Sequence, residues 1–147
     1  MKEDYSNYTD ENLIKIMNEG LDLDEEMFFV LLEIGKRNHP KTKELCLEAL
    51  NRDLGFDEYF VSSALSTLYF YDEDAALDYA KQNYKKFHVH SLGSIVSLLS
   101  MDSGEEIQTL KKREFIKIMK DHLKTLKKKD IEEIFDYDNF MKVYKNV

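Results

Sequence analysis

"FFVLLEIGKRNHPKTKELCLEAL", residues 28–50, carries the pattern of two helices joined by a short polar turn. Its first half is apolar, and in its second half Leu45, Ala49 and Leu50 recur at the spacing of one helical face. Pro40 suits the first turn of a helix, because the N–H that proline lacks has no partner there. The stretch therefore predicts a pair of antiparallel helices.

The helical pattern extends over nearly the whole chain. The sequence has one proline, five glycines and no alternating run typical of a strand. Ser103 with Glu106, and Asp130 with Glu133, have the spacing of a capping box at a helix start. We predict an all-α fold of eight helices, joined by short connections that make successive helices antiparallel neighbours. The predicted helices are 10–19, 24–37, 40–52, 57–70, 72–86, 89–101, 104–128 and 130–145.

A weak repeat with an offset of 31 residues supports a regular arrangement. "SALSTLYFYDE" (63–73) aligns with "SIVSLLSMDSG" (94–104), and small residues recur at Gly35, Ser66 and Ser97. The repeat predicts one domain, 1–147, built as an α-solenoid in which each helix pair buries a face against the next. The alternative is chance similarity between amphipathic helices. The predicted pairs are 24–52, 57–86 and 89–128, flanked by 10–19 and 130–145.

Residues 28–50 resemble a HEAT-like repeat, with an apolar first helix, a turn with Pro40 and a second helix facing inward. The resemblance covers about residues 24–128 and implies a HEAT-like α-solenoid. The later pairs lack the proline, and the last pair has a long second helix. A compact irregular helical bundle therefore remains the alternative architecture.

The charges are divided unevenly along the chain. Residues 1–80 hold 19 acidic and 7 basic side chains, whereas residues 81–147 hold 10 acidic and 14 basic side chains. An acidic half repels nucleic-acid phosphates and favours a basic protein partner with fast, salt-sensitive association. The opposing interpretation is that an acidic surface only keeps the protein soluble.

The N-terminal residues and the single cysteine indicate a cytoplasmic protein. The polar start "MKEDYSNYTDEN" has no apolar core of a signal peptide, and no apolar run is long enough for a membrane span. Cys46 is the one cysteine, so no internal disulfide can form. We expect a cytoplasmic location and no membrane partner.

Catalytic and metal-binding motifs are absent from the sequence. His88 and His90 form a His-x-His pair, but no cysteine or third histidine stands at ligand spacing. Cys46 lies among leucines and an alanine and is interpreted as a buried apolar group. We predict that the protein is not an enzyme and uses no cofactor or metal.

The segment "YFYDEDAALDY", residues 69–79, combines aromatic rings with acids and is the candidate binding surface. Tyrosines among carboxylates suit the Lys and Arg side chains of a partner, through charge pairing and cation–π contacts. The alternative is core aromatics beside acids that begin helices. The predicted partner-binding residues are Asp57, Glu58, Tyr59, Tyr69, Tyr71, Asp72, Glu73 and Asp74.

Residues 111–129 carry nine bases and two acids and give the one indication of nucleic-acid binding. No aromatic residue is interleaved on the basic helix face for base stacking. We therefore favour a solvated face that balances the acidic half, and we expect no nucleic-acid partner. A nucleic-acid-associated protein using this Lys-rich helix remains an alternative function.

A small, acidic, all-helical chain without catalytic residues resembles the immunity proteins of bacterial polymorphic toxin systems. These include contact-dependent growth inhibition systems, in which some immunity proteins have HEAT-like folds. The resemblance implies binding of a cognate toxin domain, commonly a basic nuclease, by blocking its active site or its access to substrate. The other alternative function is a helical-repeat scaffold for a protein or peptide, and exposed tyrosines are also compatible with a homodimer.

Overall fold

The computed structural model describes residues 4–19, 24–51, 58–101 and 109–147. These residues form helices and turns, with no strand among them, so the predicted all-α fold class is confirmed. The chain divides into two compact units, Met1–Glu73 and Asp74–Val147. The predicted single domain and the predicted regular solenoid stay predictions.

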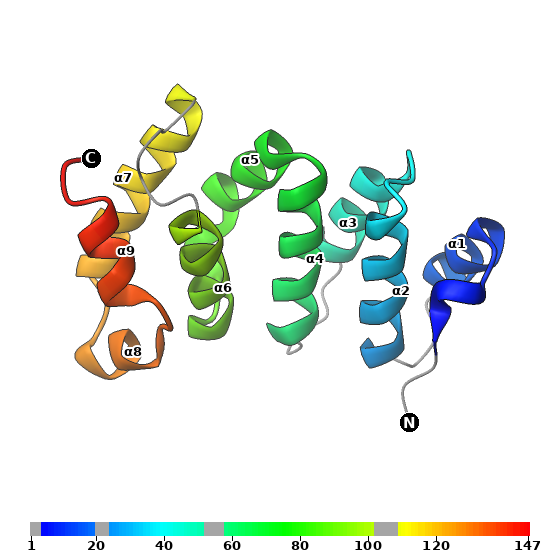
Figure 1. The fold of residues 1–147 in the computed structure, drawn as a ribbon. Helices are drawn as coiled ribbons and strands as arrows, with labels where there is room; N and C mark the ends of the chain where they lie inside the picture. The colour runs from blue at the N-terminus through cyan, green and yellow to red at the C-terminus, as the bar shows by residue number, and fades with distance from the viewer. Residues whose placement is uncertain (1–3, 20–23, 52–57, 102–108) are drawn as a thin grey trace. The chain divides into compact units, whose positions relative to one another are not determined.

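The helices of the first unit are followed by those of the second (Figure 1). The first set is η1 (Tyr5–Asn7), α1 (Asp10–Glu19), α2 (Asp24–Lys36), α3 (Thr42–Asn51) and α4 (Glu58–Tyr71). The second set is α5 (Glu73–Asn83), η2 (Tyr84–Lys86), α6 (Val89–Ser100), α7 (Leu110–Lys124), α8 (Lys128–Glu133) and α9 (Tyr137–Val143). Helix α5 begins with the last residue of the first unit.

Four predicted elements differ from the observed ones. The helix predicted at 72–86 ends at Asn83 and is followed by the separate 3-10 helix η2. The helix predicted at 130–145 is two short helices, because Asp136 takes a left-handed conformation with φ of 68° between α8 and α9. The helix predicted at 104–128 ends at Lys124, and its first five residues lie outside the described residues. Pro40 lies in the turn before α3, which begins at Thr42, whereas the sequence placed it in the first helical turn.

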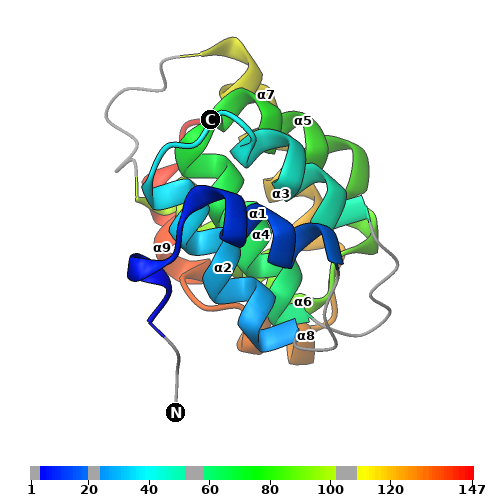
Figure 2. The same ribbon diagram turned by 90° about the vertical axis from the view of Figure 1, so that its right-hand side faces the viewer.

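In the first unit, α2, α3 and α4 pack against one another and α1 packs on α2. Figure 2, in which α1 faces the viewer, shows α1 lying in front of α2. Gly35 marks the close approach of α2 to α4, since a Cβ there would lie 2.6 Å from Thr67 Cγ2. The buried side chains of α2, α3 and α4 include Met27, Val30, Leu31, Ile34, Leu45, Cys46, Ala49, Ala64, Leu65 and Leu68.

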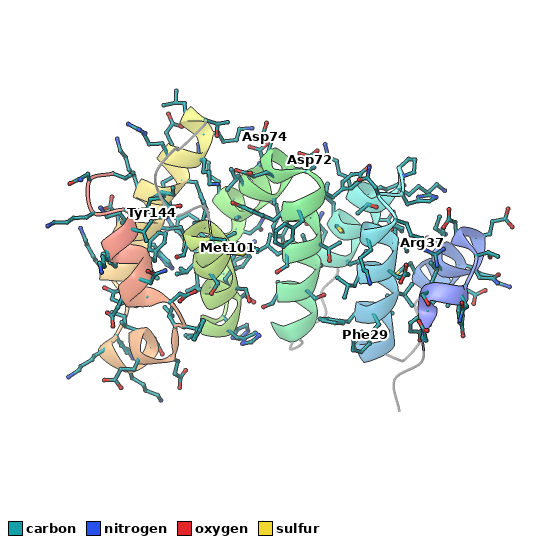
Figure 3. The ribbon with its side chains drawn as sticks, in the orientation of Figure 1. Phe29, Arg37, Asp72, Asp74, Met101 and Tyr144 are labelled. Carbon is teal, nitrogen blue, oxygen red and sulfur yellow. The ribbon has the colours of Figure 1, made fainter. Side chains whose placement is uncertain are left out.

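Arg37 joins the N-terminal segment to the end of α2 (Figure 3). Its Nη2 donates to the backbone oxygens of Tyr5 and Ser6, at 3.2 and 3.1 Å. Its Nη1 and Nε donate to Asp10 at 2.8 Å and to Glu33 at 3.0 Å. A guanidinium group has donors in a fixed fork, so one side chain holds η1, α1 and α2 together.

In the second unit, α6 packs against α8 and α9. Tyr144, which caps α9 and is labelled in Figure 3, is buried, and its hydroxyl donates to the carbonyl oxygen of Leu99 in α6. Lys120 of α7 donates to the backbone oxygens of Tyr144 and Val147, both at 2.9 Å. These bonds tie the C-terminal residues to α6 and α7.

Among the described residues, no helix is both long and apolar enough to cross a membrane. The apolar side chains along one face of α7 are instead buried. Phe115, Ile116, Met119 and Leu123 recur at spacings of one, three and four residues and are all buried.

Candidate functional site

The predicted segment Tyr69–Asp74 lies where α4 ends and α5 begins. Tyr69 is buried, with 7% of its surface exposed. It follows Leu65 by four residues and Leu68 by one, so it belongs to the buried stripe of α4. Tyr69 therefore serves the core of the first unit rather than presenting an exposed ring.

Phe70 is the exposed ring of this segment, although the sequence interpretation did not select it. It is 68% exposed and contacts Tyr69 edge to face, with ring centroids 5.9 Å apart. Each residue advances a helix by about 100°, so Phe70 lies roughly 200° around α4 from the buried Leu68. The position of Phe70 around the helix, relative to the apolar residues of α4, is the sequence signal from which its exposure could have been predicted.

Asp72 follows the half-buried Tyr71, the last residue of α4, and Glu73 and Asp74 are the first two residues of α5. The Asp72 carboxylate lies 3.5 Å from Lys43 Nζ of α3, an ion pair within the first unit (Figure 3). Glu73 is half-buried, and Asp74, which is exposed, is the first residue of the second unit. Because α5 begins at Glu73, these carboxylates also stand at a helix N-terminus, where negative charge is stabilising.

The other predicted residues lie at the opposite end of α4. Glu58 and Tyr59 are its first two residues, and Asp57 lies outside the described residues. A helix rises about 1.5 Å per residue, so α4 separates Glu58 from Tyr71 by roughly 20 Å. The sequence interpretation placed these residues near Tyr69–Asp74, whereas the structure does not bring the two groups together along α4.

Helix α3 adds a second acidic feature to the first unit. Glu44, Leu47, Glu48 and Asn51 line an open depression of about 560 Å³. Glu44 and Glu48 are exposed and stand one turn apart, with Leu47 half-buried between them. Two carboxylates beside an apolar side chain suit a Lys or Arg side chain, whose aliphatic stem favours apolar contact.

The groups with possible nucleophilic or metal-ligating chemistry are Cys46 of α3 and the pair His88 and His90 of the second unit. Burial raises the pKa of the Cys46 thiol to about 12, so the reactive thiolate is scarce at neutral pH. Within the residues that the structure covers, no three His, Cys, Asp or Glu side chains are grouped as metal ligands. His88 and His90 begin α6 as neighbours of Val89 and are exposed.

The charge asymmetry persists when the chain is divided into its two units. Residues 1–73 hold 17 acidic and 7 basic side chains, and residues 74–147 hold 12 acidic and 14 basic side chains. The net negative charge of the protein thus resides in the first unit, which also carries Phe70 and the α3 depression.

Comparison of the chain with protein-family models, curated proteins and solved structures finds no match. Neither the HEAT-like resemblance nor the resemblance to immunity proteins is therefore tested by a relative. What the protein does is inferred from its own charges, exposed rings and packing.

Proposed function

We propose that this protein is an immunity protein, which binds a cognate basic toxin domain and blocks its active site or its access to substrate. The observation that carries the proposal is the excess of 17 acidic over 7 basic side chains in the first unit. A nuclease domain must attract phosphates and is therefore basic on the surface that an inhibitor would cover. A strongly acidic helical surface is complementary to such a domain.

The end of α4 is where we place the centre of the interface. Phe70 offers an exposed ring, and Asp72 and Glu73 follow it directly. An aromatic side chain beside carboxylates can contact an Arg or Lys by a cation–π interaction and by charge pairing. Aromatic anchors that become desolvated on binding supply most of the affinity of such interfaces, while rim charges mainly accelerate association.

The acidic depression on α3 extends this surface in the first unit. Lys43, which pairs with Asp72, is the neighbour of Glu44, which lines the depression. The end of α4 and the exposed side of α3 therefore adjoin each other through this ion pair. A partner with several basic side chains could contact both.

The test is binding to the polypeptide encoded directly beside this one. The two purified proteins should form an equimolar complex, and its association rate constant should fall as the salt concentration rises. Phe70→Ala should weaken the complex at least tenfold, mainly through faster dissociation. Replacing Asp72, Glu73 and Asp74 together by Lys should slow association.

The matched control replaces three exposed acids of the second unit, Glu132, Glu133 and Asp138, by Lys. This variant has the same net charge as the variant at Asp72, Glu73 and Asp74. If the α4 surface contacts the partner, association should slow more in the Asp72, Glu73 and Asp74 variant than in this control. Equal effects of both variants would contradict the placement at α4. A failure of the two native proteins to associate would remove the proposed function itself.

A further inference from the structure

Six exposed lysines lie on η2, at the end of α7 and at the start of α8, all in the second unit. The Tyr84 ring packs edge to face on the His122 imidazole, with centroids 4.8 Å apart. This contact brings two lysines of the η2 segment, which are distant in sequence, beside the last turn of α7. The η2–α7 lysine cluster consists of Lys85, Lys86, Lys124, Lys127, Lys128 and Lys129.

The cluster differs from the basic face expected from the sequence. Three lysines of that face are used internally: Lys112 is buried, Lys111 lies 3.0 Å from the Asp78 carboxylate, and Lys120 donates to backbone oxygens. The exposed bases that remain on this segment are Arg113, Lys117 and the lysines of its C-terminal part. The fold then adds Lys85 and Lys86, which lie nearly 40 residues earlier in the chain.

The side chains of the cluster lysines are open to a partner of opposite charge. All six lysines are exposed, and among the parts of the chain that the structure covers none of their ammonium groups forms an ion pair. Asp121 and Asp130 flank the α7–α8 part of the cluster, and Glu132 and Glu133 of α8 lie one helical turn after Lys128 and Lys129. Burial and then the charge of Lys85 lower the pKa of His122, so Lys85 lies close enough to this imidazole for its charge to act on it.

A nucleic-acid backbone fits this cluster better than an acidic protein does. Lysine is depleted at protein–protein interfaces, where aromatic side chains, Met and Arg are enriched. Phosphate contacts, by contrast, are made by Lys and Arg and require no apolar floor. The cluster is all lysine, and the largest exposed apolar side chains of the second unit, Met101, Leu110 and Phe135, belong to other segments.

We propose that the η2–α7 lysine cluster binds the phosphate backbone of a nucleic acid without recognising its base sequence. Lysine ammonium groups act as point charges toward phosphate and lack the planar fork that matches base edges. This inference does not depend on the proposed immunity function, because it concerns a different unit and a partner of opposite charge.

The experiment measures fluorescence anisotropy of a labelled 20-nucleotide oligo(dT), and of a duplex of equal length, with the whole chain at 50 to 300 mM salt. We expect binding whose logarithm falls linearly with the logarithm of salt, with a slope between about −2 and −4 for a single strand. Lys85→Glu with Lys86→Glu should weaken binding at least tenfold. Lys127→Gln with Lys128→Gln and Lys129→Gln should weaken it independently.

The matched control reverses Lys36 and Lys41, two exposed lysines of the first unit. It gives the same net charge as the Lys85 and Lys86 variant and should leave binding within twofold of the native protein. The proposal is overturned if neither nucleic acid binds at 50 mM salt, or if the control variant loses as much affinity. It is also overturned if a poly-glutamate peptide of equal charge binds more tightly, because the partner would then be an acidic protein.

Discussion

Thr67 is buried in α4, and its hydroxyl has no hydrogen-bond partner among the described residues. An unpaired buried hydroxyl costs about 1–3 kcal/mol of stability, which a methyl group of similar size avoids. Thr67→Val should therefore raise the free energy of unfolding by about 1 kcal/mol. Urea denaturation followed by circular dichroism measures the change.

Thr42 provides the matched control for Thr67. It is equally buried, but its hydroxyl donates to the His39 carbonyl oxygen at 2.6 Å. Thr42→Val should lower the free energy of unfolding by about 1 kcal/mol, because the bond is lost and the carbonyl loses a donor. Stability changes of the same sign in both variants would contradict the hydrogen bonding described for the two threonines.

The buried thiol of Cys46 should make the free energy of unfolding fall as the pH rises into the alkaline range. Its pKa is about 12 in the folded protein against 9.0 for an exposed thiol, so the folded state retains the proton while the unfolded state loses it. The stabilisation is complete below pH 9 and is lost at about 1.4 kcal/mol per pH unit between pH 9 and 12. The stability advantage of the native protein over Cys46→Ala should thus shrink between pH 8 and 10.5. A constant difference across that range would show that the thiol titrates normally.

The aromatic residues of α4 show how far the exposure of a single side chain can be predicted from sequence. The mixture of rings and acids at 69–74 pointed to a surface at the end of this helix, and Phe70 is exposed there. Composition alone did not separate the buried Tyr69 from the exposed Phe70. Their separation follows from helical phase, which can be assigned only after the buried stripe through Leu65 and Leu68 is known.

At the scale of elements, the packing of α2 on α4 depends on Gly35. A Cβ at this position would lie 2.6 Å from Thr67 Cγ2, which is closer than van der Waals contact allows. Gly35→Ala should lower the free energy of unfolding by about 1 kcal/mol or more, despite alanine's higher helix propensity. Adding Thr67→Ser, which removes the opposing methyl, should restore part of this loss in a double-mutant cycle.

Gly93 is the control for this substitution. It lies inside α6, and a Cβ there would be 3.7 Å from the Phe135 backbone nitrogen, an ordinary contact. Gly93→Ala should be neutral or stabilising by up to about 1 kcal/mol, because only the helix propensity changes. A Gly35→Ala variant as stable as the native protein would contradict the close packing of α2 and α4.

Arg37 connects three elements of the first unit, so its removal should loosen a defined segment. Arg37→Lys keeps the charge but loses the forked donors to Tyr5, Ser6, Asp10 and Glu33. Hydrogen–deuterium exchange of the Tyr8 amide, which donates to Tyr5, should become faster. The exposed Arg113→Lys should not change it, and unchanged exchange in both variants would show that Arg37 does not hold η1.

Helix boundaries were predictable where start signals are local. The predicted 10–19 coincides with α1, where the Thr9 hydroxyl accepts from the Asn12 amide as an N-cap. The break between α8 and α9 was missed because Asp136 takes its positive φ without a glycine or proline to mark it. The burial of Lys112 and the bonds of Lys120 were also missed, since they depend on contacts between distant segments.

At the scale of the whole molecule, charge is divided unevenly between the two units. The first unit holds the acidic excess and the exposed Phe70, and the second holds the lysine cluster. The sequence located the acidic half correctly by counting, because net charge needs no structure. The sequence could not assign a binding face. A carboxylate that contacts a partner and a carboxylate that begins a helix give the same pattern in a single sequence.

The measurement that tests the proposed immunity function most directly is growth of cells that express the neighbouring polypeptide, with and without this protein. We expect the neighbour alone to stop growth, and the native protein to restore growth and to co-purify with the neighbour in equimolar amount. The Phe70→Ala variant, expressed at the same level, should restore growth less well. A harmless neighbour, or a toxic one that this protein neither binds nor counteracts, would contradict the function proposed here.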